Sequence, residues 1–201
     1  MAVARPSSPD SPEPPLTPAG ERLLAAAADL FYARGIRAVG VDLIAEAAGT
    51  TKKTLYDQFG SKDALLARYL GRRARRWQIF VTARLEPHEP GARQVLTVFD
   101  ALEEWLAGLD RGCAFVNAYA EIGGTDHPGV PVIRAEKAWM RELFQRLTER
   151  AGVDSPDDTG AQLHLLYEGA IAAHAAGGLP DAMSHARAAV GRLLQEPLPP
   201  R

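Results

Sequence analysis

The sequence predicts an all-α fold of about nine helices, with a compact three-helix head at the N-terminus and a larger helical domain after it. Residues that favour strands are sparse, since aromatic residues make up only 7% of the 201, whereas the helix formers Ala, Leu, Arg and Glu abound. Apolar residues recur at intervals of three and four. Start and stop signals divide the chain into segments of helical length.

The first helix is expected between Thr17 and Gly35. Thr17 is suited to cap free amides, Pro18 suits the first helical position, and Gly35 tolerates the left-handed conformation that ends many helices. One face of this segment carries apolar residues at helical spacing, which are Leu23, Ala27, Leu30 and Phe31.

Two short helices follow, at 41–48 after Gly40 and at 52–59 after a Thr51 cap, with Gly49 between them. Leu55 and Phe59 stand one turn apart as anchors of the later helix. The earlier one is expected to turn Leu43, Ile44, Ala47 and Ala48 inward. Two short helices joined by a tight Gly-containing turn, and covered by a preceding helix, predict a helix-turn-helix.

The rest of the chain supplies six further helical segments. Ser61 is expected to cap a long helix that ends near residue 84, and a Pro-rich break at 86–91 follows it. Ser155 repeats the cap, proline and acid pattern. The remaining helices are expected at 92–109, at 113–122, from 128–131 to 150, at 156–176 and at 181–195.

These segments predict a division of the chain into a disordered Pro-rich tail, a head, a connecting helix, a ligand-binding and dimerisation domain, and a frayed end. Their bounds are 1–16, 17–60, 61–84, 85–196 and 197–201. The tail has no apolar stretch of a secretory signal, and no apolar run approaches the ~20 residues of a membrane span. The lack of such a run argues against a membrane partner. The single Cys113 permits no internal disulfide, which favours a cytoplasmic location.

The net charge of −2 is unevenly distributed along the chain. Residues 17–76 hold 11 Lys or Arg against 6 Asp or Glu, whereas residues 77–201 hold 11 against 17. A basic N-terminal part on an acidic body is typical of a DNA-binding head, although chance alone produces such asymmetry about as often.

The stretch VDLIAEAAGTTKKTLYDQFGSKDALL, at 41–66, resembles the DNA-binding signature of the TetR family of repressors. That signature has an Ile-Ala pair, a turn glycine, a Thr-Leu-Tyr triplet with a Phe four residues after the Leu, and a Ser-Lys pair. Here these are Ile44, Ala45, Gly49, Thr54, Leu55, Tyr56, Phe59, Ser61 and Lys62. The resemblance implies a helix-turn-helix head and a ligand-binding, dimerising C-terminal domain.

If Leu55 and Phe59 point inward, the residues that face outward are Lys52, Lys53, Tyr56 and Asp57. The resemblance implies that Tyr56 and Lys62 contact backbone phosphates of DNA. Lys53 departs from the family, where a small residue is common, and acidic Asp57 is a poor contact. The predicted DNA-binding residues are Thr51, Lys52, Lys53, Thr54, Tyr56, Gln58 and Lys62.

The stretch RGCAFVNAYAEIGGTDHPG, at 111–129, is similar to a C-terminal-domain motif of one branch of that family. Asn117 and Glu121 stand one turn apart in it, suited either to line a pocket or to make capping or helix-bridging hydrogen bonds in the core. An aromatic-rich body suits an apolar or aromatic effector, although core packing explains most of these rings equally well. The pocket candidates are Phe99, Trp105, Phe115, Asn117, Tyr119, Glu121, Trp139, Phe144, His164 and Tyr167.

The last two helices are rich in small residues, which permit close helix approach. The resemblance implies that these helices form a four-helix dimer interface, although packing between the two helices of one subunit is an alternative. The interface candidates are Gly169, Ala172, Ala173, Ala176, Ala186, Ala189, Val190 and Leu193.

A cluster of four arginines at positions 72, 73, 75 and 76 suits an intramolecular role or a solvated one better than phosphate binding. The apolar neighbours of Cys113 favour a buried, inert thiol. No metal-ligand spacing, phosphate loop or catalytic constellation is apparent, so neither a cofactor nor an enzymatic activity is expected.

The sequence thus predicts a repressor that occupies a palindromic operator in double-stranded DNA as a homodimer and is released by a small-molecule effector of unknown identity. Activation in place of repression is not excluded. The alternative is a helical ligand-binding or adaptor protein whose head has lost DNA binding, and Lys53 with Asp57 is its main support.

Overall fold

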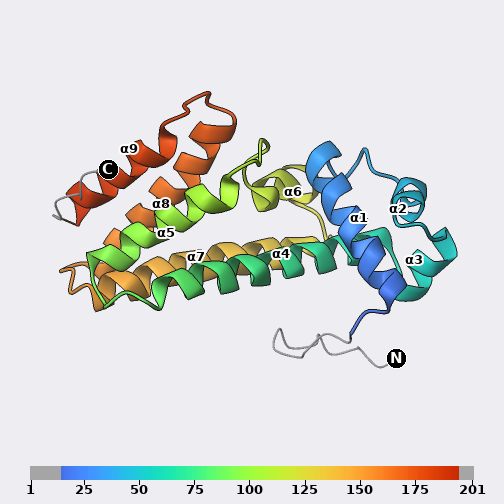
Figure 1. Cartoon of the computed structure of the whole chain (residues 1–201), viewed down its shortest axis with the longest axis horizontal. Helices are drawn as coiled ribbons and strands as arrows, with labels where there is room; N and C mark the ends of the chain where they lie inside the picture. The colour runs from blue at the N-terminus through green and yellow to red at the C-terminus, as the bar shows by residue number, and fades with distance from the viewer. Residues whose placement is uncertain (1–14, 195–201) are drawn as a thin grey trace.

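The computed structural model describes residues 15–194, and over that range the chain forms α-helices and no strands (Figure 1). The all-α prediction is therefore confirmed. The predicted tail up to residue 14 and the predicted frayed end at 197–201 lie outside the described residues. The helices are α1 Pro18–Arg34, α2 Val41–Ala47, α3 Lys52–Phe59, α4 Lys62–Leu85, α5 Ala92–Leu106, α6 Ala114–Ile122, α7 Gly129–Arg150, α8 Pro156–Ala175 and α9 Ala182–Leu193.

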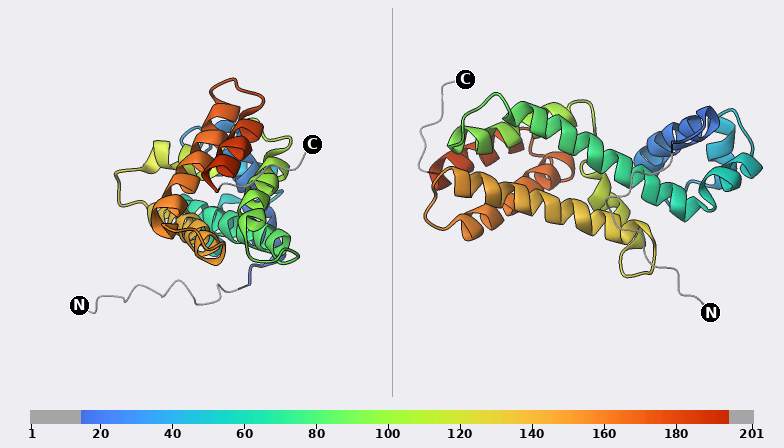
Figure 2. Two further views of the ribbon diagram at one scale, coloured as in Figure 1. Left: turned by 90° about the vertical axis from the view of Figure 1, so that its left-hand side faces the viewer. Right: turned by 90° about the horizontal axis from the view of Figure 1, so that it is seen from below.

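The molecule is elongated, with α1, α2 and α3 gathered at one end (Figure 1). The long helix α4 packs against α1 and α3 in this head and against α5 and α7 in the body. Helices α5, α8 and α9 complete the far end of the body, and α6 lies between the head and the rest (Figures 1 and 2). None of the described helices is long and apolar enough to cross a membrane.

Side-chain caps begin the helices that build and carry the head. Thr17, Thr51 and Ser61 each accept a hydrogen bond from the backbone amide three residues later, at 3.1, 3.1 and 2.9 Å. These are the caps that the sequence predicts. Ser155 holds the N-cap position of α8, with Pro156 and Asp157 after it as predicted, but its side chain makes no capping hydrogen bond.

Two further expectations need correction. Helix α5 ends at Leu106 and not near 109, because Ala107 turns extended, with ψ 120°, and Gly108 has a φ of +78°. In α2, Ala47 is exposed, whereas the sequence predicts that it faces inward. The buried face of α2 is centred on Ile44 and Ala45 and continues to Ala48, which leaves Ala47 on the outer side.

The apolar interior consists of two clusters. The body cluster joins α4, α5, α7, α8 and α9, and Phe99, Met140 and Phe144 are fully buried in it. The head cluster joins α1, α2, α3 and the first half of α4, but it also takes in Phe115 from α6 and Ile133 from α7. Helix α6 is thus packed into the core of the head. Because close-packed interiors transmit strain, a movement of α6 displaces side chains in that core.

Candidate nucleic-acid interface

Helix α3 is held so that one face points away from the molecule. Leu55 is fully buried in the head cluster and Phe59 is half-buried beside it. The turn before α3 uses Gly49 at a φ of +58°, and the Thr51 cap fixes the first turn. The structure therefore brings Lys52, Lys53 and Tyr56 together on the exposed side, with 48% of Tyr56 accessible.

Each lysine of this face already has an acidic partner. The Nζ of Lys52 lies 2.7 Å from Asp42 of α2, and that of Lys53 lies 2.6 Å from Asp57 one turn later. All four side chains are more than half exposed, so each pair adds little stability and exchanges readily. A phosphate that approached this face would compete with two carboxylates for the ammonium groups.

Three other predicted contact residues are tied into the head. The hydroxyl of Thr54 lies 3.0 Å from that of Thr51. The side-chain oxygen of Gln58 accepts a 2.7 Å hydrogen bond from the hydroxyl of Thr17 at the start of α1. Lys62 donates to the carbonyl of Ile36 at 2.7 Å. Gln58 and Lys62 thus join α3 and α4 to the two ends of α1.

The basic cluster of α4 faces α1. Arg72 makes two hydrogen bonds to the carboxylate of Glu21, at 2.5 and 2.8 Å, and this contact holds the pKa of Glu21 below its usual value. The guanidinium of Arg73 lies 5.2 Å from the ring centre of Tyr32 and 5.8 Å from that of Trp105. The role of Arg72 and Arg73 is thus intramolecular, within the head and at its junction with the body.

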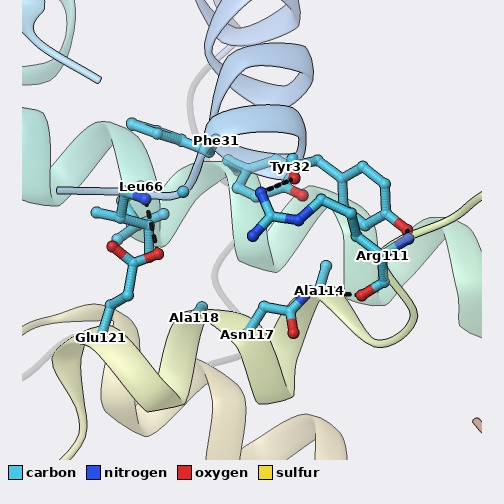
Figure 3. Close-up of a pocket in the computed structure, with 11 residues that line it drawn as sticks. Phe31, Tyr32, Leu66, Arg111, Ala114, Asn117, Ala118 and Glu121 are labelled. Carbon is cyan, nitrogen blue, oxygen red and sulfur yellow. Dashed lines mark hydrogen bonds between the residues drawn. The ribbon is translucent and has the colours of Figure 1, made fainter. Parts of the chain in front are cut away.

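Helix α6 is joined to the end of α1 by polar contacts, which we call the α1–α6 clasp (Figure 3). The carboxylate of Glu121 accepts the backbone amides of Ile36 and Arg37, both at 2.8 Å, and Arg37 donates to the Glu121 carbonyl, also at 2.8 Å. Arg111 donates to the Tyr32 carbonyl at 2.8 Å, and Asn117 donates to the Arg111 carbonyl at 2.7 Å. Glu121 thus bridges α6 to the segment after α1, Asn117 bonds to the turn before α6, and both also line the small pocket drawn in Figure 3.

The ten pocket candidates do not surround one cavity. Phe99, Phe144, His164 and Tyr167 pack together in the body, with ring centres 5.8 to 6.5 Å apart. Trp105 packs against the rings of Trp77 and Phe80. Phe115 belongs to the head core, and Asn117 and Glu121 lie in the clasp. Tyr119 is 43% exposed, and Trp139 packs partly buried against the body cluster.

Sequence reasoning missed a partly buried ionic cluster between α7 and α8. The Lys137 ammonium lies 2.8 Å from Glu168, 3.3 Å from Glu136 and 3.4 Å from the Cys113 sulfur. Burial raises the pKa of Glu136, which is 3% exposed. Burial also raises the pKa of the Cys113 thiol, although Lys137 opposes this, which agrees with the expectation of an inert thiol. Nothing in the spacing of these residues along the chain indicates that they meet.

The predicted dimer residues fall into three groups by exposure. Gly169, Ala172 and Ala176 lie exposed along α8, and Leu165, which was not predicted, continues this stripe with 73% exposure. Ala186 and Val190 are instead buried against their own subunit's core, and Ala173, Ala189 and Leu193 are intermediate. The surface available to a partner is therefore mainly that of α8.

Comparisons with a family model and with solved structures identify the same family. The family model described as bacterial regulatory proteins, tetR family, matches residues 23–69. The crystal structure of a TetR-family transcriptional regulator from Streptomyces coelicolor has a TM-score of 0.82 and 32% identity, over 90% of this chain and 96% of that one. A TetR-type transcriptional regulator from Streptomyces avermitilis has a TM-score of 0.75 and 30% identity, over 89% and 99% of the two chains.

An HTH-type transcriptional regulator of Mycobacterium tuberculosis is 34% identical over 107 residues, which make up 53% of either chain. The match therefore spans about half the length of this curated relative. All three relatives are named as transcriptional regulators, a class of DNA-binding proteins and not of enzymes.

Proposed function

This chain belongs to the TetR family of transcriptional regulators, and we therefore propose that it is a cytoplasmic repressor that occupies a palindromic operator as a homodimer and is released by a small-molecule effector. The observation that carries the proposal is the exposed face of α3. It presents Lys52, Lys53 and Tyr56 on a helix fixed by the buried Leu55. Such a helix fits the major groove, where lysines and the tyrosine hydroxyl reach phosphates and base acceptors.

The proposed dimer uses the α8 stripe of Leu165, Gly169, Ala172 and Ala176. Small residues along an exposed helix let a second helix approach closely, and Leu165 adds an apolar side chain that water otherwise covers. Two heads joined in this way would read successive major grooves about 34 to 36 Å apart, which requires a palindromic site.

Effector release is proposed to act through the α1–α6 clasp. Glu121 and Arg111 tie α6 to the end of α1, so a ligand that shifts α6 within the body displaces the head with it. Helix α4 spans both parts and would carry the same movement. The effector binds more tightly to the dimer arrangement in which the two heads no longer match the groove spacing. The operator binds more tightly to the arrangement in which they do match it.

The test is binding of the full-length protein to the intergenic DNA upstream of its own gene, measured by fluorescence anisotropy at two salt concentrations. We expect sequence-selective binding that weakens steeply with salt, because phosphate contacts release counterions. A Lys52→Ala, Lys53→Ala, Tyr56→Ala variant should lose selective binding and reduce the logarithmic salt slope by about 2, one unit for each lysine removed. Arg134→Ala with Arg141→Ala removes two exposed charges from the body and is the matched control.

A second function has specific support in the two ion pairs of the α3 face. Because Asp42 and Asp57 neutralise Lys52 and Lys53, the same surface would suit an adaptor or ligand-binding protein that has lost DNA binding. A folded, dimeric protein that shows no salt-dependent preference for any segment of its upstream DNA would favour this alternative.

A further inference from the structure

A cleft of about 510 Å³ lies where the head meets the body, between α1, α4 and the end of α5. We propose that this junction cleft binds a small aromatic carboxylate, one ring system that carries a single acidic group. The cleft is apart from the buried rings of Phe99, Phe144 and Tyr167, none of which lines it. Its volume is in the range of ordinary small-molecule sites.

The charges of the cleft favour an anion. Arg72, Arg73 and Arg76 line it, and Asp29 is the one acidic residue among the lining residues. Arg72 is occupied by Glu21, but Arg73 and Arg76 form no ion pair with any residue of the range 15–194. Both guanidinium groups thus lack a carboxylate partner in that range, although Arg73 also lies over the rings of Tyr32 and Trp105, and guanidinium is the side-chain group whose planar donors match a carboxylate best.

A buried donor also lacks a partner here. Tyr69 lines the cleft and is 6% exposed. Its hydroxyl makes no hydrogen bond within the described part of the chain. Burial raises the pKa of Tyr69, so the hydroxyl keeps its proton at neutral pH. Buried polar groups are rarely left unpaired, and a ligand oxygen would satisfy this one.

The rest of the lining is aromatic and apolar. The ring centres of Tyr32 and Trp105 lie 5.2 and 5.8 Å from the Arg73 guanidinium. Two leucines and three alanines complete the apolar part, which are Leu24, Leu109, Ala25, Ala28 and Ala107. A ring would gain contacts with these side chains. The carboxylate of Asp29 opposes ligands that carry several negative charges, which favours one carboxylate over a phosphate ester.

The position of the cleft links this binding to regulation. Asp29 and Tyr32 belong to α1 in the head, whereas Trp105 and Leu109 belong to the body. A ligand that contacts both sides restrains their relative orientation, so it should change operator affinity. This consequence rests on the proposed function, while the binding itself does not.

Isothermal titration of the full-length protein with benzoate, 1-naphthoate and indole-3-acetate tests the binding without DNA. We expect at least one acid to bind with one molecule per chain, about tenfold tighter than 1-naphthylmethanol, the neutral counterpart of 1-naphthoate. Arg76→Ala should weaken binding about tenfold and Tyr69→Phe about fivefold, since each removes one partner of the carboxylate. Arg75→Ala removes the neighbouring exposed arginine, which does not line the cleft, and should change the affinity less than about twofold.

No binding of any of the three acids to the folded protein would overturn the proposal. So would equal affinity for 1-naphthylmethanol, or a loss in Arg75→Ala as large as that in Arg76→Ala. Titration of the acid into the protein and operator DNA then separates the two proposals. Acid binding without any selective DNA binding would contradict only the repressor function, and selective DNA binding without acid binding would contradict only the cleft.

Discussion

At the scale of single residues, the position of the head depends on a few polar side chains that reach it from the body. Glu121 is the clearest case, because its two carboxylate oxygens accept the backbone amides of Ile36 and Arg37 directly after α1 ends. The carboxylate thereby satisfies amides that the loop leaves without a helical partner. A charged acceptor makes such hydrogen bonds stronger than neutral ones.

Replacement of Glu121 by Ala should therefore destabilise the protein by about 2 kcal/mol, since two amides lose a charged acceptor. Thermal and urea unfolding of the two proteins measure the change. Glu103→Ala, which removes an exposed glutamate of α5, is the control and should shift stability by less than about 0.5 kcal/mol. Equal stability of wild type and Glu121→Ala would show that the clasp does not hold the head.

Glu168 gives a second prediction, which concerns pH. Burial raises its pKa, but the imidazole of His164, whose Nε2 lies 3.4 Å away, and the ammonium of Lys137 outweigh burial, and the net effect lowers the pKa below 4.5. A carboxylate with a lowered pKa in the folded state contributes stability above its unfolded pKa and loses it as pH falls through the folded value. Wild-type stability should hence decline as pH falls below about 5.

A Glu168→Gln variant should lose roughly 2 kcal/mol at pH 7, less than for a fully buried pair because the side chain is 26% exposed. It should also show a smaller decline in acid. Chemical unfolding between pH 3 and pH 7 compares the two proteins. Parallel stability curves for wild type and variant would show that Glu168 is not the group that titrates.

At the scale of helices, side-chain caps distinguish α1, α3 and α4 from the other described helices, including α2 of the head, which follows Gly40 without such a cap. Thr17, Thr51 and Ser61 cap α1, α3 and α4 with side-chain oxygens, whereas no side chain caps the start of α6, α7, α8 or α9. Capped short helices keep their ends fixed without help from neighbours. This matters most for α3, which has only eight residues and a single fully buried anchor.

The two serines that precede α4 and α8 make a matched pair for this difference. Ser61→Ala should cost about 1 kcal/mol, because the amide of Ala64 loses its acceptor at 2.9 Å. Ser155→Ala should cost less than about 0.5 kcal/mol, because that side chain caps nothing. Unfolding midpoints in urea measure both, and similar losses in the two variants would contradict the assignment.

At the scale of the whole molecule, the surface of the subunit carries two large exposed aliphatic side chains with nearly equal accessibility. Leu165 on α8 is 73% exposed and Ile79 on α4 is 70% exposed. Leu165 continues into a stripe of exposed small residues, Gly169, Ala172 and Ala176, whereas Ile79 lies between the exposed Arg76 on one side and Thr82 and Ala83 on the other. Equal exposure with unequal surroundings therefore separates the proposed dimer face from an ordinary exposed side chain.

Leu165→Glu should convert the proposed dimer to monomers at micromolar concentration, since a charge buried in an apolar interface weakens association by about a hundredfold or more. Ile79→Glu, with the same chemical change at the same exposure, should remain dimeric. Sedimentation velocity of the three proteins measures the state of each. A monomeric wild type, or a dimeric Leu165→Glu, would show that α8 is not the interface.

The helices, most of their ends and the family can be predicted from the amino-acid sequence alone, because these depend on local signals. Caps, prolines, glycines and the spacing of apolar residues act within one or two turns, and the signature at 41–66 is continuous in the chain. The outward face of α3 follows directly, since burial of Leu55 leaves Lys52, Lys53 and Tyr56 on the other side.

Which distant residues meet depends on the tertiary structure. The contact of Glu121 with the end of α1 spans 85 residues, and Lys137 meets Glu168 across a turn between two helices. No periodic pattern encodes such pairs, so the sequence does not predict which backbone amides Glu121 accepts and gives no sign of the junction cleft. Gln58 likewise has a local pattern that suits base contact, yet Thr17, which is 41 residues away, holds it. Helical spacing fixes the side of a helix on which a residue lies, but the packing of one helix against another decides what that residue touches.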